Sequence, residues 1–171
     1  MLNTLAAIAR SSTYWLLLFA LGVILEAVAL FYQYELEYWP CVICIHVRVW
    51  VLVFSLIAIA GIFTRRIWSL RSLMHALVTI IMAILVERSW NLLGVERGTI
   101  EGSCSMASGL PNWFALDAWF PAIFKVWEPC GYTPELMFGI TMAEALLVLF
   151  IGLLLVSALL TLASLRDKRT V

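Results

Sequence analysis

The sequence has few charged residues. Only 13% of its 171 residues are charged, whereas 64% are hydrophobic and the mean hydropathy is +1.00. A soluble domain carries about 25% charged and roughly 45–50% apolar residues. So few polar side chains cannot cover a globule in water. The composition therefore excludes an ordinary soluble domain and indicates a protein that folds in a lipid bilayer.

The chain also lacks the patterns of several common functions. It has no basic stripe for nucleic acid, no glycine-rich phosphate loop and no Ser–His–Asp set. Its one C-x-x-C pair supplies only half of a tetrahedral zinc site, so no metal is expected. The two histidines, His46 and His75, are expected to lie at an interface or to serve in packing.

Long apolar runs predict membrane-spanning helices, each of which needs ~20 mainly apolar residues. The third run is the weakest, because Glu87 and Arg88 interrupt it. The predicted spans are residues 14–34, 44–63, 72–92 and 145–165, with outer loops at about 35–43 and 93–144. The expected fold is a single all-α membrane domain, a four-transmembrane-helix bundle.

The distribution of charge supports four spans. Lys and Arg near helix ends gather on the cytoplasmic side of a membrane. With four spans, seven basic residues fall on one side and most acidic residues fall in the opposite loops. Both chain ends are therefore expected in the cytoplasm. The seven residues are Arg10, Arg65, Arg66, Arg71, Arg166, Lys168 and Arg169.

A cleaved signal peptide is the alternative reading of the N-terminal region. Arg10, the apolar run that follows it and the small residues 27–29 (AVA) imitate the three parts of such a signal. Glu26 lies beside the would-be cleavage site and argues against cleavage. The run is therefore expected to remain as the first span.

All four cysteines fall on the outer side in this topology. Cys41 and Cys44 begin the second span, and Cys104 and Cys130 lie in the second outer loop. Four cysteines allow three pairings, of which the spacing favours Cys41–Cys44 and Cys104–Cys130. A Cys41–Cys44 bridge closes too small a loop to stabilise much, so a redox role is expected there. A purely structural bridge remains the alternative for Cys104–Cys130.

An arginine follows the cysteine pair in the pattern P-C-x-x-C-x-x-x-R. Pro40 ends the preceding loop, so Cys41 and Cys44 should occupy the start of a helix, whose N–H groups favour a thiolate. Arg48 lies four residues beyond Cys44 on the same face, and Glu26 is a candidate ion-pair partner for it. Arg48 could also simply reach the headgroups. A membrane quinone is the natural electron acceptor, because it takes two electrons and develops negative charge beside the arginine.

The sequence resembles the disulfide bond formation protein B (DsbB) family. The similarity rests on Pro40, Cys41, Cys44 and Arg48, on the segment 116–121 (LDAWFP), and on one cysteine pair in each outer loop. The resemblance implies a thiol–quinone oxidoreductase of the bacterial inner membrane, with all cysteines periplasmic. It would reoxidise a periplasmic thioredoxin-like (DsbA-like) dithiol oxidase and reduce ubiquinone or menaquinone from the membrane pool.

The resemblance also implies roles for individual residues. The partner's thiolate would attack Cys104, after which Cys130 would engage Cys41 and free Cys44 beside the quinone. The quinone would be bound by Cys44, Arg48 and Glu26.

The third span departs from the family pattern. Many relatives carry a histidine near its outer end that is thought to assist the quinone, whereas residues 87–93 read ERSWNLL. Arg88, Ser89 and Asn91 are the polar candidates to replace it.

Two other functions remain open. One is a non-catalytic membrane scaffold with structural disulfides, and the other is a reductase related to the vitamin K epoxide reductases. Substitution of Cys44 by serine separates catalysis from a scaffold, because only catalysis needs the thiol.

An apolar pattern marks the second outer loop. Within residues 110–128, large apolar residues recur at helical spacing, and Pro121 should divide the segment into two short helices. The segment is expected to form a short interfacial helix on the outer leaflet, or else to be a loop that packs on the bundle. The spaced residues are Trp113, Leu116, Phe120, Ile123 and Trp127.

Overall fold

Long helices dominate the computed structural model, which describes residues 2–102, 106–137 and 139–166. Four helices in this part of the chain are long and apolar enough to cross a membrane. Each contains one of the predicted spans, so the four-helix membrane fold is confirmed. The helices are α2 (Ser12–Tyr34), α3 (Val42–Thr64), α4 (Trp68–Glu96) and α7 (Met142–Arg166).

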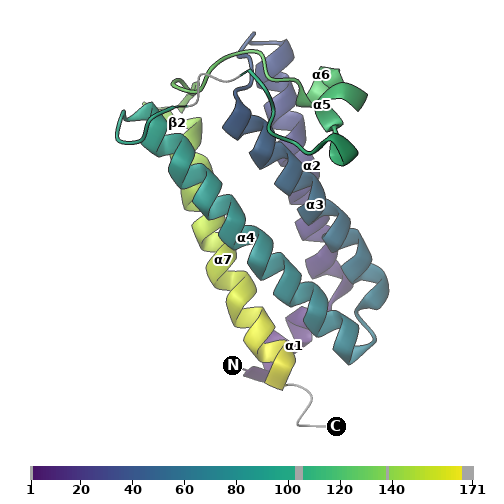
Figure 1. The fold of residues 1–171 in the computed structure, drawn as a ribbon. Coiled ribbons are helices and arrows are strands. Elements are labelled where there is room, and N and C mark those ends of the chain that lie inside the picture. The colour runs from purple at the N-terminus through teal and green to yellow at the C-terminus, as the bar shows by residue number, and fades with distance from the viewer. Residues whose placement is uncertain (1, 103–105, 138, 167–171) are drawn as a thin grey trace.

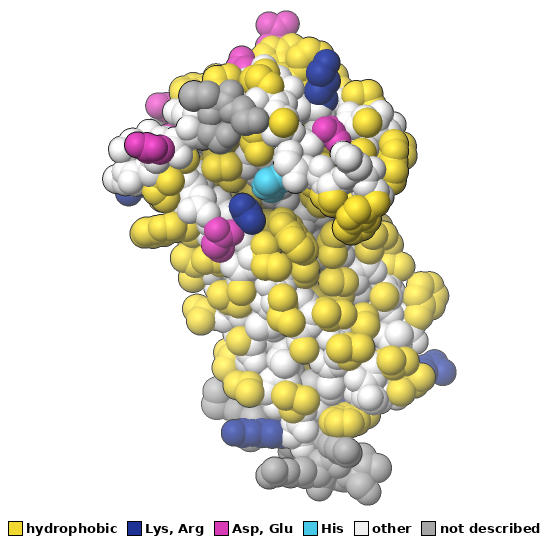
Figure 2. Space-filling view, viewed as in Figure 1, with side chains coloured by type: hydrophobic (Ala, Val, Ile, Leu, Met, Phe, Trp, Pro, Cys, Tyr) yellow, Lys and Arg dark blue, Asp and Glu magenta, His cyan; other side chains and the backbone are white. Residues whose placement is uncertain are grey.

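The helices pack in the order α2, α3, α4, α7, with the two described chain ends at the same end of the bundle (Figure 1). Helices α2 and α7 scarcely touch, so the bundle is open on one side. Large side chains from all four helices meet in a common core, where Trp15, Phe54, Leu85 and Phe150 are fully buried. Hydrophobic side chains cover the middle of the molecule, whereas charged ones gather towards its ends (Figure 2). This distribution fits a bilayer around the bundle.

Glycines bring α2 and α3 close together. A Cβ atom added at Gly61 would lie 2.2 Å from Cε3 of Trp15, and one added at Gly22 would lie 2.1 Å from Oγ of Ser55. Small residues at such crossings let helix backbones approach in a membrane. These contacts lie in the middle of α2 and α3 and at the end away from the cysteine pair, and they fix the packing of the two helices that carry Arg48 and Gln33.

A short helix that the sequence did not predict closes the other end of the bundle. Helix α1 (Leu2–Arg10) packs against α7. Nε2 of His75 donates a hydrogen bond of 3.1 Å to the carbonyl of Ala9, and the His75 ring packs against Trp15. His75 is fully buried, as its predicted packing role requires.

The second outer loop folds over the N-terminus of α3. Its elements are the 3-10 helix η1 (Asn112–Phe114), α5 (Leu116–Trp119), α6 (Pro121–Phe124), and the antiparallel strands β1 (Glu135–Met137) and β2 (Ile140–Thr141). Pro121 does separate two short helices, as predicted.

The predicted apolar stripe of this loop is not one continuous face. Trp113 is 78% exposed and Phe120 is 55% exposed, whereas Leu116 is buried. Leu116, Phe124 and Val126 form a cluster with residues of α3. The loop therefore packs on the bundle, and its contact with the outer leaflet stays a prediction.

Candidate redox site

The cysteine pair lies at the N-terminus of α3. Pro40 precedes Cys41, which caps the helix in an extended conformation and accepts a hydrogen bond of 3.4 Å from the backbone N–H of Cys44. The two sulfur atoms are 2.8 Å apart. The predicted position of the pair in the first turn is thus confirmed, and both thiols face the partial positive charge of the helix end.

Cys130 from the second outer loop reaches the same helix end. Its side chain packs against the cluster that contains Cys41, and the Cys41 thiol and the backbone N–H groups of Val42 and Ile43 lie close enough to influence its ionisation. Contact with the Cys41 thiol and partial burial raise the pKa of the Cys130 thiol. The backbone N–H of Trp127 donates to the carbonyl of Pro40 over 3.1 Å, which holds this part of the loop in place.

Cys41 is the central member of this cluster, since it contacts both Cys44 and Cys130. All three are free thiols in the structure. Cys104 lies outside the described residues. Two residues before it, Gly102 lies so close to Cys130 that an added Cβ would be 2.8 Å from the Cys130 carbonyl oxygen.

Arg48 is buried one helical turn below Cys44, with a side chain only 6% exposed. Its Nη1 donates to Oε1 of Gln33 over 2.6 Å and to the carbonyl of Ile123 over 2.9 Å. Its Nη2 donates to the carbonyl of Ala29 over 2.9 Å. The predicted ion pair with Glu26 does not form, because these three acceptors hold the guanidinium instead. The burial of Arg48 inside the bundle does not favour the alternative that its side chain reaches the headgroups.

Gln33 connects this arginine to the outer loop. It is 1% exposed, and its Nε2 donates to the carbonyl of Ala122 in α6 over 3.1 Å. The hydroxyl of Tyr34 donates to the same carbonyl over 2.5 Å. A signal for this role is present in the sequence, because Gln33 lies two helical turns from Glu26 on the same face of α2.

A cavity of about 440 Å³ opens beside Cys44 and Arg48. It lies between α2, α3, α7 and the outer loop, on the side where α2 and α7 are apart. Glu26 also lines it, and Oε1 of Glu26 is buried without a hydrogen-bond partner in the part of the chain that the structure describes. Most of the remaining lining is apolar, including Leu25, Val28, Leu146 and Leu149.

The residues of the cavity fit a quinone. Small-molecule sites are mostly apolar pockets of roughly 300–1,000 Å³ with a few converging polar groups. Here the polar groups among the lining residues of α2 and α3 include a fixed cation, Arg48, and the carboxyl oxygen of Glu26 that is unpartnered among the described residues.

The polar residues expected to replace the family histidine do not line this cavity. Leu92 is the α4 residue that does. Asn91 instead donates to the carboxylate of Glu87, and Arg88 forms an ion pair of 3.2 Å with the same carboxylate. Ser89 is buried elsewhere in the bundle.

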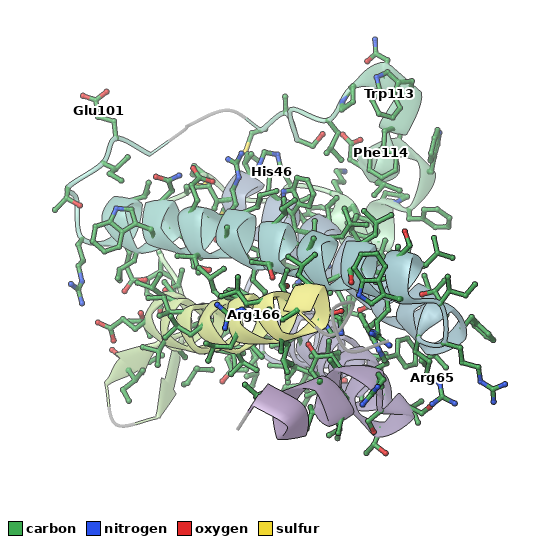
Figure 3. The ribbon with its side chains drawn as sticks, turned by 90° about the horizontal axis from the view of Figure 1, so that it is seen from below. His46, Arg65, Glu101, Trp113, Phe114 and Arg166 are labelled. Carbon is green, nitrogen blue, oxygen red and sulfur yellow. The ribbon has the colours of Figure 1, made fainter. Side chains whose placement is uncertain are left out.

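His46 anchors the loop segment that follows Cys104. Its Nε2 donates to the carbonyl of Ser108 over 2.7 Å, and Oγ of Ser108 donates to Oδ2 of Asp117 over 2.7 Å. Figure 3 shows His46 beside the loop that runs on from Glu101. His46 does not line the cavity, so it acts on the loop.

The structure thus brings together five of the predicted residues in one half of the bundle. They are Cys41, Cys44, Cys130, Arg48 and Glu26. Adjacent thiols at a helix N-terminus, beside an apolar cavity with a buried arginine, define a membrane protein built for thiol–disulfide chemistry.

Comparison with known proteins identifies the family. Residues 11–160 match the family model for disulfide bond formation protein DsbB, and the chain belongs to this family. It is therefore a multi-pass membrane protein of disulfide bond formation.

Curated relatives agree. The chain is 32% identical over 152 residues to disulfide bond formation protein B of Shewanella denitrificans, which covers 88% of this chain and 87% of the relative. It is 31% identical to the protein of that name from Shewanella loihica, over 87% of this chain and 88% of the relative. It is 30% identical to the protein of that name from Idiomarina loihiensis, over 86% of this chain and 82% of the relative.

Proposed function

We propose that the protein is an inner-membrane dithiol:quinone oxidoreductase that reoxidises a periplasmic thioredoxin-like, DsbA-like dithiol oxidase. The observation that carries the proposal is the position of Cys41, which contacts Cys130 on one side and Cys44 on the other. A thiol in this position can exchange disulfides with both neighbours. Membership of the DsbB family supports disulfide formation as the outcome.

The thiols form a relay from the outer loop towards the membrane. The partner's thiolate attacks the Cys104–Cys130 disulfide at Cys104 and releases Cys130 as a thiolate. The N–H groups of Val42 and Ile43 stabilise that thiolate beside Cys41. Cys130 then attacks Cys41 of a Cys41–Cys44 disulfide and releases Cys44. The partner's second thiol then attacks the mixed disulfide and leaves as an oxidised partner, which frees Cys104. The Cys104 thiolate attacks Cys130 of the Cys130–Cys41 disulfide, which restores Cys104–Cys130 and leaves Cys41 and Cys44 reduced. Each step exchanges one S–S bond for another, so two electrons move inward.

A quinone bound in the cavity would supply a two-electron, two-proton acceptor for the oxidation of Cys41 and Cys44 to a disulfide. Arg48 faces this cavity with its guanidinium already fixed by Gln33, Ala29 and Ile123. Its Nε–H and one Nη2–H make no hydrogen bond to the described residues. These donors stabilise negative charge that develops in the cavity and on Cys44.

The open side of the bundle provides an entrance from the lipid to the cavity. Because α2 and α7 scarcely touch, the cavity meets the lipid between Leu25 and Val28 on one helix and Leu146 and Leu149 on the other. An acceptor with an apolar tail can enter there without crossing water.

The proposed orientation places the cysteines in the periplasm and both chain ends in the cytoplasm. It rests on Arg10, Arg65, Arg66 and Arg166, which lie at the ends of helices opposite the thiol cluster. Lys and Arg in such positions are typical of the cytoplasmic side.

Quinone reduction by the purified protein tests the proposal. The protein receives a reduced thioredoxin-like dithiol protein and either ubiquinone or menaquinone, and loss of quinone absorbance is followed. Turnover should vanish in Cys44→Ser and fall strongly in Arg48→Leu. Arg88→Leu is the matched control, because Arg88 lies on the outer half of α4 and does not line the cavity. No turnover by folded, unchanged protein with either quinone would leave the structural-scaffold alternative.

A further inference from the structure

We propose that Glu26 is the proton donor of the quinone cavity, an inference that rests on the proposed function. The observation behind it is an unused carboxyl oxygen. Oε1 of Glu26 is buried and has no hydrogen-bond partner among the described residues, although Glu26 lines the same cavity as Cys44 and Arg48. Buried polar groups nearly always form a hydrogen bond, so a polar atom without one in the wall of a cavity indicates that a ligand supplies the partner.

The position of Glu26 along α2 separates it from Arg48's own partners. Ala29 and Gln33 hold the guanidinium, and Glu26 lies on the same face one turn further into the membrane. Three residues of helix correspond to a rise of about 4.5 Å. Arg48 therefore borders the outer part of the cavity, and Glu26 borders its inner part.

Glu26 is the acid within the membrane part of the cavity wall. Helix α3 contributes Cys44 and Arg48, whereas the α7 residues in the lining are apolar. The other titratable groups in the lining come from the outer end of α2 and from the loops. They are Tyr32, Glu37, Tyr38, Glu128 and Tyr132.

The chemistry requires a proton donor at this depth. Oxidation of Cys41 and Cys44 to a disulfide releases two electrons and two protons. Reduction of a quinone to a quinol consumes two electrons and two protons. Arg48 can balance negative charge, but a guanidinium does not give up its proton in a protein. A carboxyl group can, and an isolated carboxylate is costly in an apolar cavity unless a cation lies nearby.

Glu26 therefore holds a proton on its carboxyl group before turnover and gives it to the acceptor oxygen. The carboxylate that remains is stabilised by Arg48 across the cavity. A thiol proton released on oxidation of the cysteine pair then restores the carboxyl group. Over one cycle two S–H bonds break, one S–S bond forms, and both protons end on the acceptor.

Steady-state kinetics of the full-length protein in lipid nanodiscs test this role. The variants are Glu26→Gln, which keeps the shape but has no acidic proton, and Glu26→Asp, which keeps the acid. Glu35→Gln is the matched control, since Glu35 is an exposed acid at the end of α2 and does not line the cavity. Glu26→Gln should lower kcat by roughly 10²-fold, the lower end of general-acid effects, with little change in the KM for ubiquinone. Its residual turnover should fall as pH rises, because protons must then come from water. Glu26→Asp should recover part of the lost kcat.

A second readout needs no quinone. The infrared spectrum of the quinone-free protein should contain a carboxylic acid C=O band that Glu26→Gln removes and Glu35→Gln leaves. This band reports the stored proton directly.

The outcomes separate this inference from the proposed function. Full turnover in Glu26→Gln, a raised KM with unchanged kcat, or no change in the infrared band would overturn the proton-donor role alone. Dithiol exchange with the partner should stay normal in Glu26→Gln, and its loss would also overturn the role. Absence of quinone reduction by the unchanged protein would overturn the proposed function, and the role of Glu26 with it.

Discussion

At the scale of single residues, the hydrogen bonds of the Arg48 guanidinium explain how a membrane helix tolerates a buried cation. Burial of an unpaired charge costs several kcal/mol, and hydrogen bonds must offset that cost. Two of its three acceptors are the backbone carbonyls of Ala29 and Ile123, and the third is the side chain of Gln33. Among the described residues, Gln33 is thus the side-chain acceptor of Arg48 that mutation can remove directly.

Gln33→Leu should weaken the quinone site. It removes the acceptor for Arg48 and the donor for Ala122, and a hydrogen bond to a charged group contributes about 1.5–3 kcal/mol. The KM for ubiquinone should rise about tenfold or more, while dithiol exchange with the partner protein stays normal. Gln33→Glu is the control that keeps an acceptor for Arg48, and its KM for ubiquinone should rise less. An unchanged KM in Gln33→Leu would show that the backbone carbonyls suffice.

The reactivity of Cys130 should depend on pH in a defined direction. Contact with the Cys41 thiol and partial burial raise its pKa, so its reactive thiolate is scarce at neutral pH. In the fully reduced protein, alkylation of Cys130 should be slow at neutral pH and should still be accelerating above pH ~8.5, where an ordinary thiol is half ionised. Mass spectrometry of iodoacetamide-treated protein measures the rate. Cys41→Ser should shift the rate profile to lower pH, and a plateau near neutral pH in the unchanged protein would contradict the prediction.

At the scale of helices, the α2–α3 contact positions the site. Helix α2 supplies Glu26, Ala29 and Gln33, and α3 supplies Cys44 and Arg48. The two helices must therefore keep their spacing if the cavity is to keep its shape.

Gly61→Ala should loosen this contact. The new methyl group would meet the Trp15 ring at 2.2 Å, and Trp15 is fully buried, so the helices must separate. Overpacking of this kind costs about 1–3 kcal/mol. Thermal unfolding in detergent should begin at a lower temperature. Gly152→Ala is the matched control, because nothing lies within 4 Å of its added Cβ, and it should be neutral or slightly stabilising. Equal stability of the two variants would show that Trp15 can move aside.

At the scale of the whole molecule, the bundle could be predicted because its signals are long. Apolar runs determine the four spans, and the position of Pro40 determines that the cysteine pair begins a helix. The partners of Arg48 could not be predicted in the same way. Glu26 was the expected partner by charge. Every residue has a backbone carbonyl, so the sequence does not indicate that the carbonyl of Ile123 accepts a hydrogen bond from Arg48. Helix α1 and the β1–β2 hairpin were missed because they are short, and tertiary contacts hold them.

The orientation of the molecule can be tested by labelling single introduced cysteines in a variant without native cysteines. Thr99→Cys lies at an exposed position in the loop after α4, and Arg66→Cys lies between α3 and α4 at the opposite end of the bundle. A membrane-impermeant maleimide added to intact bacteria should label the first and spare the second. Disruption of the cells should make both reactive. The reverse pattern in intact cells would invert the proposed topology.

The gap between α2 and α7 has a consequence for how turnover scales. A molecule that reaches the cavity through this gap arrives by diffusion within a sheet of lipid, so the relevant concentration is its number per lipid molecule. Addition of lipid at constant protein and acceptor would slow such an enzyme, whereas a larger volume of buffer would not. The open side of the bundle thus ties the rate of a periplasmic reaction to the composition of the bilayer.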